Sequence, residues 1–272
     1  MKFIQLVQEH YSSLTKSEKK VADYLLMIKE KTIYSTMNDI KDMTKVGDAT
    51  IIRFCQKLGF SGFSDLKIAV AKEDFSQTSS GLEKTFYDQV LARLFDALNS
   101  TRQLINEKEL ARAIAKISKA RNLYLFGVGS SGNTSMNLEN MFLRVGVHCK
   151  AVVDPHFQAQ SASLLGKGDV VIGFSLSGRT KDTYDSMKIA KQNGVTLIAV
   201  TNYLSTPIAK LSDIVLQTSI DEFLDGGSLA GIISQLYLCN VLVQGYELEN
   251  KINTIELREK ALRSIIDKSI ES

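Results

Sequence analysis

The spacing of hydrophobic positions changes along the chain. Through the first 75 residues, short segments with helical spacing alternate with polar turns, and residues 73–81 form a polar run rich in Ser, Thr and Gly that is typical of a linker. Residues 86–105 and 107–120 then have the spacing of two amphipathic helices. The apolar residues that share one face of the first of these helices are Val90, Leu91, Leu94, Phe95 and Leu98.

Beyond residue 122, apolar runs alternate with helical segments. The apolar runs, which predict strands, are 123–128, 151–153, 170–174, 197–200 and 214–216. The helical segments are 133–145, 157–165, 183–192, 208–211, 229–246 and 249–269. Strands and helices that alternate at this spacing predict a doubly wound parallel sheet. The expected fold class is therefore α/β, with an all-helical domain at 1–75, a linker at 76–85 and a sheet-containing domain at 86–272.

Composition and charge set limits on this picture. With 272 residues, 44% of them hydrophobic and 23% charged, the chain is long enough for two soluble domains with separate cores. No apolar run approaches the ~20 residues that span a bilayer, and the N-terminal stretch lacks the apolar segment of a signal peptide, so we expect a cytoplasmic protein without a membrane partner. Cys55, Cys149 and Cys239 are far apart in apolar surroundings, which favours reduced core thiols over disulfides or a metal site. The net charge of +3 is too small to indicate nucleic-acid binding by itself.

The most informative candidate site follows the third predicted strand. The run Asp-Val-Val-Ile-Gly-Phe-Ser-Leu-Ser-Gly-Arg-Thr at 169–180 predicts a buried strand that ends in small hydroxyl residues just before a helix begins. Residues 175–180 are termed the serine loop. Free backbone N–H groups, hydroxyl groups and the positive end of a helix dipole together favour an anion, and phosphate is the usual one. The alternative is that the Ser and Thr side chains only cap the helix.

A second loop, residues 127–132 or the glycine loop, follows the first predicted strand. Its sequence Gly-Val-Gly-Ser-Ser-Gly resembles the opening of a dinucleotide-binding fingerprint, with Asp154 as the nearest acidic candidate for a ribose. A nucleotide site is therefore one alternative. Ligands bind beyond the carboxyl ends of parallel strands, and two serine-containing loops at that edge fit a phosphorylated sugar better. One loop would hold the phosphate and the other the polyol.

The two loops together resemble the sugar isomerase (SIS) domain, a flavodoxin-like domain that binds phosphosugars. The resemblance rests on Gly-x-Gly-Ser-Ser in the glycine loop and Ser-x-Ser-Gly-x-Thr in the serine loop, and it covers roughly residues 107–246. The residues that it implies for the phosphate are Ser175, Ser177, Gly178 and Thr180. Those implied for the sugar are Gly129, Ser130, Ser131 and Glu139.

Whether such a site would be catalytic depends on a base, because aldose–ketose isomerisation moves a proton between adjacent carbons. SIS isomerases resemble one another in using Glu and often His, but the predicted helix 229–246 contains neither, and the histidines are His10, His148 and His156. Glu139 stands about where similar heptose-phosphate isomerases place a base, with a solvent-facing or interface carboxylate as the alternative. His156 either reaches the pocket or lies in a surface loop. We expect binding without turnover, with no catalytic residue, metal or cofactor. The competing hypothesis is a phosphosugar aldose–ketose isomerase with a helical accessory domain.

The first 75 residues contain a candidate helix-turn-helix. A short helix at 39–44, a turn at 45–47 and a second helix at 48–58, ended by Gly59, have suitable lengths. The apolar residues spaced to pack these two helices together are Ile40, Val46, Ile51 and Phe54. The alternative is a small helical interaction domain with scattered lysines.

The second of these helices would present its outward face to the major groove of DNA. Arg53 can pair bidentately with guanine, and Ala49 or Ile52 can meet a thymine methyl group. Lysines, including Lys67, can bind phosphates. The residues expected to contact DNA are Lys45, Gly47, Asp48, Ala49, Thr50, Ile52, Arg53 and Lys57.

The same region resembles the N-terminal domain of RpiR-type transcriptional regulators. The resemblance rests on Leu-Thr-Lys-Ser-Glu-Lys-Lys-Val-Ala at 14–22 and on Arg-Phe-Cys-Gln-Lys-Leu-Gly-Phe-Ser-Gly-Phe at 53–63. Gly47, where the family tends to carry Ser, and Lys41, where it usually has a small residue, depart from the pattern and bear on the preferred DNA sequence.

Together the two resemblances cover nearly the whole chain and imply a helix-turn-helix, a linker and a non-catalytic SIS domain. We expect a transcriptional regulator of carbohydrate metabolism genes that binds double-stranded operator DNA and a phosphosugar effector as a homodimer or homotetramer. A third hypothesis is a phosphosugar-binding module that recruits another protein, which would lack salt-dependent affinity for DNA.

Overall fold

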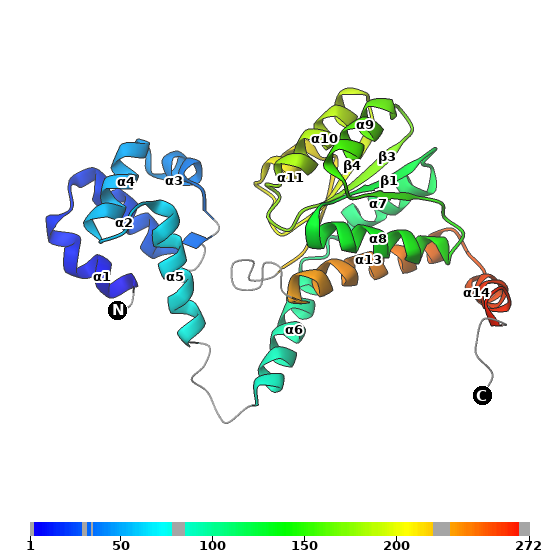
Figure 1. The fold of residues 1–272 in the computed structure, drawn as a ribbon, viewed down its shortest axis with the longest axis horizontal. Coiled ribbons are helices and arrows are strands. Elements are labelled where there is room, and N and C mark those ends of the chain that lie inside the picture. Colours follow the sequence, from blue (N-terminus) through cyan, green and yellow to red (C-terminus); the bar gives the residue numbers. More distant parts are fainter. Residues whose placement is uncertain (1–2, 29–31, 34, 78–84, 220–228, 267–272) are drawn as a thin grey trace. The chain divides into compact units, whose positions relative to one another are not determined.

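The computed structural model describes residues 3–28, 32–33, 35–77, 85–219 and 229–266 (Figure 1). The chain divides into two compact units, Met1–Tyr87 and Asp88–Ser272. Helix α5 (Phe63–Gln77) continues through the first part of the polar run at 73–81. Most of the linker predicted at 76–85 falls on residues 78–84, which lie outside the described residues.

The described residues of the first unit are mainly helical. In chain order the elements are α1 (Phe3–His10), η1 (Tyr11–Ser13), α2 (Lys16–Ile28), α3 (Met37–Thr44), α4 (Asp48–Lys57) and α5. Capping boxes fix the starts of α2 and α3: the Glu18 carboxylate accepts a hydrogen bond from the Thr15 N–H, and the Asp39 carboxylate accepts one from the Thr36 N–H, both at 2.8 Å. The apolar faces of these helices are buried, and their fully enclosed side chains include Val7, Val21, Leu25, Ile40, Ile51, Phe54 and Leu66.

The second unit contains a five-stranded sheet in the order β2-β1-β3-β4-β5. The strands are β1 (Leu123–Phe126), β2 (Lys150–Val152), β3 (Val170–Phe174), β4 (Thr196–Thr201) and β5 (Ile214–Gln217). Every pairing is parallel, and the register aligns Phe126 with Val152 on one side and with Gly173 on the other. This confirms the predicted doubly wound parallel sheet, so the carboxyl ends of the strands lie along one edge.

Helices cover both faces of this sheet (Figure 1). The described helices of the second unit are α6 (Phe86–Gln103), α7 (Glu107–Ser118), α8 (Gly129–Leu143), α9 (Pro155–Leu164), α10 (Lys181–Gln192), α11 (Pro207–Leu211), α13 (Leu229–Glu249) and α14 (Thr254–Arg263). Helices α7, α8 and α13 pack on the face that carries Ile172 and Phe174, and α9, α10 and α11 pack on the face that carries Val171. Strand β3 is buried at every position, which explains its unbroken apolar sequence.

Helix α6 differs from the expectation. The sequence places five apolar residues on one face, but the side chains that α6 buries are those of Ala97 and Thr101. The residues of the predicted apolar face that are exposed are Val90, Leu91 and Phe95. The first turns of α6 therefore carry large apolar side chains that the second unit does not cover.

The C-terminal helices also differ in detail from the prediction. The segment 249–269 is not one helix, because Lys251 adopts a φ of +51° and α14 begins after it. Helix α13 is, among the described residues, the one helix whose length and composition would let it cross a membrane, with a mean hydropathy of 1.2. Its Leu238 and Leu242 lie in the core with α7 and α8, so its apolar sequence is explained by packing.

Two of the three cysteines lie in the cores. Cys55 and Cys239 are buried and Cys149 is half-buried, and all three are free. Burial raises the pKa of the Cys55 thiol to about 12, so this thiol is protonated at neutral pH and is not a reactive nucleophile.

Candidate effector site and candidate DNA-reading surface

The hydroxyl groups of the serine loop converge where β3 ends. The backbone N–H of Ser175 still donates to the Val200 carbonyl at 3.1 Å, which fixes the start of the loop against β4. The Oγ atom of Ser175 then lies 2.9 Å from the Oγ1 atom of Thr180, and the Oγ atom of Ser177 accepts a hydrogen bond from the Arg179 N–H at 3.2 Å. Three of the predicted phosphate ligands are thus gathered in one tight turn.

The helix that follows this turn has an uncapped N-terminus. Thr180 is the N-cap residue of α10, but its side chain makes no capping hydrogen bond and faces Ser175 instead. The first backbone bond of the helix runs from the Tyr184 N–H to the Thr180 carbonyl at 3.0 Å. Thr183, in the first turn, is fully buried, and its Oγ1 atom has no partner among the described residues. The positive end of α10 is therefore open to an anion, and the alternative that Thr180 only caps the helix does not agree with the structure.

Gly178 closes the serine loop against the segment that follows β4. Its φ of +63° lies in the left-handed region, and a Cβ atom there would lie 2.1 Å from Thr206 Oγ1. Its carbonyl accepts a hydrogen bond from the Ile208 N–H at 3.1 Å. Because any side chain would clash, glycine at this position is a steric requirement of the loop.

The glycine loop begins helix α8 and owes its shape to its glycines. Gly129, the first helical residue, has a φ of +57°. A Cβ atom on Gly127 would lie 2.8 Å from the Ser131 carbonyl oxygen, and one on Gly132 would lie 3.0 Å from the Gly127 carbonyl oxygen. Behind the loop, the buried Gln158 side chain donates to the Gly127 carbonyl at 3.0 Å and holds it in place.

The three glycines have the G-x-G-x-x-G spacing of the dinucleotide fingerprint, so spacing alone does not exclude a nucleotide. The acidic residue that would bind the ribose has a structural role. Asp154 is the N-cap of α9 and accepts hydrogen bonds from the N–H groups of His156 and Phe157 at 2.9 and 3.0 Å. One oxygen of the Asp154 carboxylate is thus used to cap α9.

The two serines of the glycine loop differ in their surroundings. Ser131 is 8% exposed, and its Oγ accepts a hydrogen bond at 3.2 Å from the Nε2 of Gln235, a fully buried residue of α13. The Oε1 of Gln235 in turn accepts from the Thr134 hydroxyl at 3.0 Å. Ser130 is half-buried, and its hydroxyl group has no hydrogen-bond partner among the described residues. Gln235 was not among the predicted site residues; its amide within the apolar first half of α13 was the available signal.

Glu139 lies apart from both loops. At 1.5 Å per residue it is about 15 Å along α8 from Gly129. Together with the larger effect of burial, its charge raises the pKa of Cys149, just before β2, to about 12, so its carboxylate lies towards the amino ends of the strands. The structure does not bring Glu139 to the loops of its own chain, contrary to the sugar-binding role expected of it. His156 is exposed in the first turn of α9.

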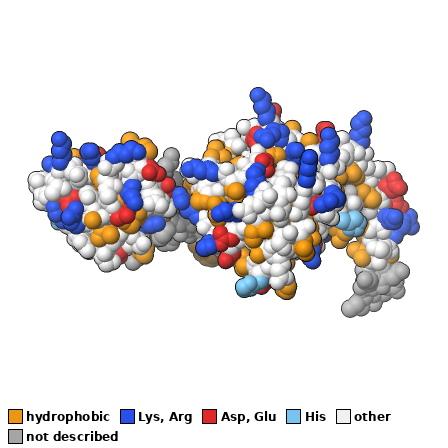
Figure 2. All heavy atoms as spheres, turned by 90° about the horizontal axis from the view of Figure 1, so that it is seen from above, with side chains coloured by type: hydrophobic (Ala, Val, Ile, Leu, Met, Phe, Trp, Pro, Cys, Tyr) orange, Lys and Arg blue, Asp and Glu red, His pale blue; other side chains and the backbone are white. Residues whose placement is uncertain are grey.

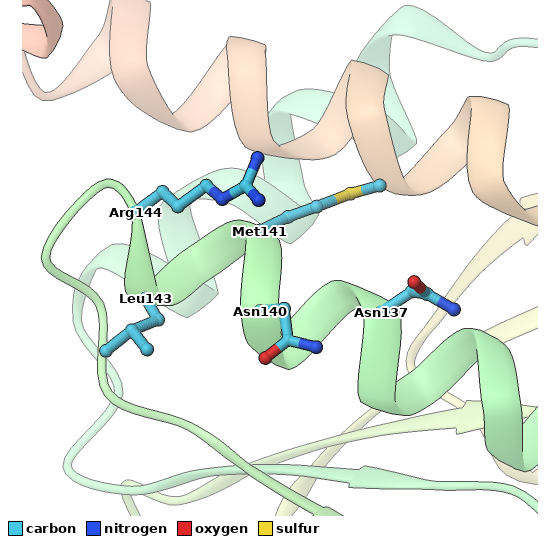
Figure 3. Close-up of a pocket in the computed structure, with 5 residues that line it drawn as sticks. All are labelled: Asn137, Asn140, Met141, Leu143 and Arg144. Atoms are coloured by element: carbon cyan, nitrogen blue, oxygen red, sulfur yellow. The ribbon is translucent and has the colours of Figure 1, made fainter. Parts of the chain in front are cut away.

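The same half of α8 borders a surface hollow of about 310 Å³ (Figure 3). In Figure 3 the Met141 side chain extends towards α13, while the polar groups come from successive turns of α8 itself. The residues that line the hollow are Asn137, Asn140, Met141, Leu143 and Arg144. None of the predicted effector residues is among them, so this hollow is separate from the candidate effector site.

The first unit contains the predicted helix-turn-helix, formed by α3 and α4. The short helix starts two residues earlier than expected, and the connecting turn is made by Lys45, which has a φ of +56° and donates its N–H to the Lys41 carbonyl at 2.8 Å. Ile40, Ile51 and Phe54 are fully buried between the helices, as their spacing predicted. Val46 is only half-buried.

The outward face of α4 carries most of the predicted DNA contacts. The exposed members of this set are Lys45, Gly47, Asp48, Ala49, Ile52, Arg53 and Lys57, and Thr50 is half-buried. Asp48 pairs with Lys41 at 3.1 Å across the turn, which reduces its charge at the start of α4. Lys67 donates to the Ser35 carbonyl at 3.4 Å.

Lys57 has a structural partner that the sequence did not indicate. Its Nζ atom lies 2.7 Å from Glu18 Oε2 and 3.1 Å from the Ser13 carbonyl oxygen. Glu18 is 3% exposed. Burial favours the neutral carboxyl group, but hydrogen bonds from Lys57 and Thr15 outweigh it, and the pKa of Glu18 is lowered. The Lys57 ammonium group therefore stabilises the fold, and fewer of its N–H donors are available for a DNA phosphate.

Basic side chains are not concentrated on one unit. On the face shown in Figure 2, Lys and Arg side chains occur on both units among acidic and hydrophobic groups. DNA recognition by this chain would therefore depend on the local arrangement of α4 rather than on overall charge.

Comparisons with known proteins identify both domains. The profile of the helix-turn-helix domain of the rpiR family matches residues 1–77, and the SIS domain profile matches residues 116–244. An uncharacterized HTH-type transcriptional regulator of Haemophilus influenzae is 35% identical and aligns over 96% of this chain and 95% of its own. The HTH-type transcriptional regulator RpiR of Escherichia coli K12 is 32% identical over 81% of this chain and 76% of its own. The structure of the Vibrio vulnificus NanR protein complexed with ManNAc-6P superimposes with a TM-score of 0.79 at 27% identity, covering 98% of this chain and 99% of that one. The chain therefore belongs to the RpiR family of HTH-type transcriptional regulators, with an N-terminal helix-turn-helix and a C-terminal SIS domain.

Proposed function

We propose that this regulator controls carbohydrate metabolism genes in the cytoplasm by binding operator DNA through α4 and a phosphosugar through the second unit, without converting the sugar. The observation that carries the proposal is the meeting of the Ser175 and Thr180 hydroxyls at the uncapped N-terminus of α10. This arrangement has the donors for a phosphate dianion. It occurs in a chain whose first unit contains a helix-turn-helix with Arg53 exposed.

In the effector site, the phosphate is bound by the serine loop and the first turn of α10, and the sugar lies towards the glycine loop. The proposed phosphate ligands are Ser175, Ser177, Gly178 and Thr180, and the proposed sugar contacts are Gly129, Ser130 and Ser131. NanR, which is complexed with ManNAc-6P, supports a phosphorylated sugar over a nucleotide. Glu139 is left out because it lies about 15 Å along α8 from the loop.

In the DNA complex, the N-terminal half of α4 enters the major groove, Arg53 contacts a guanine, and Ala49 or Ile52 contacts a thymine methyl group. Lys45 and Thr50 contact the phosphate backbone beside it. A homodimer or homotetramer would present two such helices to half-sites about one DNA turn apart. The effector acts on DNA binding only if it binds one arrangement of the assembly better than the other.

The surroundings of the loops support binding without turnover. Isomerisation needs a base within hydrogen-bond reach of the sugar carbons. Of the described acidic residues near the loops in sequence, Asp182 is exposed in the first turn of α10, Asp154 caps α9 and Glu139 lies along α8. Gln235 and Ser234 occupy the stretch of α13 that faces the glycine loop, and neither titrates at neutral pH.

Calorimetry, DNA binding and a turnover assay test this function together. The full chain is titrated with ManNAc-6P, arabinose 5-phosphate, inorganic phosphate and unphosphorylated N-acetylmannosamine. A DNA duplex selected by the protein from a randomised library is titrated with and without the tightest-binding sugar phosphate. We expect heat with a sugar phosphate but not with the unphosphorylated sugar, DNA affinity that falls with salt and changes with the effector, and unchanged sugar phosphate by NMR. Steady conversion of the sugar phosphate would instead favour the isomerase.

A further inference from the structure

A buried polar junction joins the end of the sheet to helix α6. The hydroxyl of Thr101, on α6, accepts a hydrogen bond from the Ser219 N–H at 3.1 Å and donates one to the Ser219 carbonyl at 3.3 Å. The Ser234 hydroxyl of α13 donates to the same carbonyl in a long contact of 3.5 Å. Thr101 and Ser234 are fully buried. Ser219, just after β5, is therefore held between two helices.

One route of hydrogen bonds leads to this junction from the serine loop. The Leu176 carbonyl accepts bonds from the Asn202 N–H at 2.9 Å and from the Thr201 hydroxyl at 3.1 Å. The Asn202 side-chain oxygen accepts a hydrogen bond from the Thr218 hydroxyl. Thr218 is fully buried and precedes Ser219 in the chain. Hydrogen bonds thus link the serine loop to the junction across β4 and β5.

A second route leads there from the glycine loop. Ser131 is bonded to Gln235 of α13 at 3.2 Å, and Gln235 follows Ser234 in the same helix. Gln235 is fully buried and Ser131 is 8% exposed, so the link is largely shielded from solvent. Each of the two loops that form the proposed effector site is therefore linked to Ser219, and Ser219 is hydrogen-bonded to Thr101 of α6.

Helix α6 is packed against the second unit near its C-terminal end, while its first turns are exposed. Ala97 and Thr101, near its C-terminal end, are its buried residues, while Phe86 near its start is 78% exposed. At 1.5 Å per residue, Phe86 lies about 22 Å from Thr101, so a rotation of about 10° at the junction would move Phe86 by about 4 Å. The residues before α6 connect it along the chain to the helix-turn-helix unit.

We infer that Thr101 is a positioning residue: through it, binding of the effector changes the orientation of α6, and the orientation of α6 changes the affinity for DNA. A buried donor or acceptor left without a partner is costly. A shift of Leu176 or Ser131 is therefore transmitted along the chain of bonds to Thr101 rather than absorbed within it. The inference rests on the proposed function, because it names the residue that couples its two sites.

The test compares Thr101→Val, which keeps the shape of the side chain but removes its hydroxyl, with Thr101→Ser, which keeps the hydroxyl. For each full-length variant, the dissociation constant for the library-selected duplex is measured with and without the tightest-binding sugar phosphate of the panel above. Inorganic phosphate serves as a probe of the serine loop alone. The ratio of the two DNA constants is the coupling factor, and linkage requires the same factor for sugar phosphate binding with and without DNA.

We expect Thr101→Val to bring the coupling factor to within about twofold of one. The affinity for sugar phosphate without DNA and the affinity for DNA without effector should each change by less than about threefold. Thr101→Ser retains the coupling of the unaltered protein. If Thr101→Val does not fold, Ser234→Ala, which removes one of the two helix contacts to Ser219, is expected to reduce the factor in a folded chain. Undiminished coupling in a folded Thr101→Val, or in Ser234→Ala where that variant replaces it, overturns the inference alone. Absence of coupling in the unaltered protein overturns the proposed function as well.

Discussion

Lys57, at the C-terminal end of α4, forms an ion pair at 2.7 Å with Glu18, a buried residue in the first turn of α2. The two residues are far apart in sequence, and the pair fixes α4 against the rest of the first unit. Because the carboxylate is 3% exposed and the ammonium 37%, removal of the lysine would leave a buried charge without its main partner.

Replacement of Lys57 by Ala should therefore destabilise the first unit. We expect a loss of about 2 kcal/mol in its free energy of unfolding. The measurement is hydrogen–deuterium exchange of the α4 amides in the full chain. The matched control is Lys41→Ala, which breaks the exposed pair with Asp48 and should change the same free energy by less than about 0.5 kcal/mol. Equal effects of the two substitutions would show that the Glu18 pair is no more than a surface contact.

The second unit should lose stability in acid through Asp169. This residue is 1% exposed at the start of β3, and hydrogen bonds from Arg121, Asn122 and the Gly166 N–H hold its carboxylate. The Arg121 guanidinium is the main cause that lowers the pKa of Asp169 to about 2, against the opposing effect of burial. A carboxyl group whose folded pKa lies below its unfolded value stabilises the fold above the unfolded pKa, and that contribution is lost as the pH falls through the folded pKa.

We expect the second unit to lose about 2 kcal/mol between pH 5 and pH 2 through this carboxyl group. Urea unfolding of the full chain, followed by exchange of the β3 amides, measures the change. Asp169→Asn should be less stable at pH 7 and should lack this part of the pH dependence. A variant that keeps the full acid-induced loss would assign the effect to other carboxyl groups.

Much of this fold could be predicted from the sequence, because local patterns determine it. The strands are continuous apolar runs bounded by polar turns, and β3 was placed with its observed limits, Val170–Phe174. The glycine and serine loops were located because small residues gathered where such runs ended. The helix-turn-helix was recognised because Ile40, Ile51 and Phe54 have the spacing of packed helices.

Contacts between distant segments could not be predicted in the same way. Glu139 has a plausible place in the sequence, but its distance from the loops depends on the direction of α8 down the sheet. Gln235 reaches Ser131 only because α13 packs on α8. The pairing of Lys57 with Glu18 depends on how α2 crosses α4. In α6 the prediction failed in the other direction, because residues expected to be buried are exposed. An amphipathic pattern predicts that one face of a helix is buried but does not identify the surface that covers it.

Arg53 should decide the DNA sequence preference. It is exposed on α4, and a bidentate contact with guanine contributes about 1–3 kcal/mol to discrimination between bases, roughly ten- to hundredfold in affinity. Arg53→Ala should weaken binding to the selected duplex by this factor and leave sugar phosphate affinity unchanged. Fluorescence anisotropy at fixed salt measures the first quantity and calorimetry the second. Arg263→Ala, in the exposed pair with Glu259 on α14, is the control and should leave operator affinity unchanged. Unchanged operator affinity in Arg53→Ala would exclude this face of α4 from base recognition.

The serine loop should control the effector response without affecting basal DNA binding. The double substitution Ser175→Ala and Ser177→Ala removes two hydroxyl donors from the proposed phosphate site. Hydrogen bonds to charged groups contribute about 1.5–3 kcal/mol each, so we expect sugar phosphate affinity to fall by at least about a hundredfold. Calorimetry measures this loss, and anisotropy shows whether DNA affinity without effector stays within about twofold.

Ser163→Ala is the control for the loss of a serine side chain. It removes an exposed hydroxyl of α9 that, among the described residues, is bonded only to the Gln160 carbonyl. Because Ser175 also contacts Thr180, thermal unfolding of the double variant must remain close to that of the unaltered chain for the comparison to hold. A folded double variant that still binds the sugar phosphate and responds to it would place the phosphate elsewhere in the second unit.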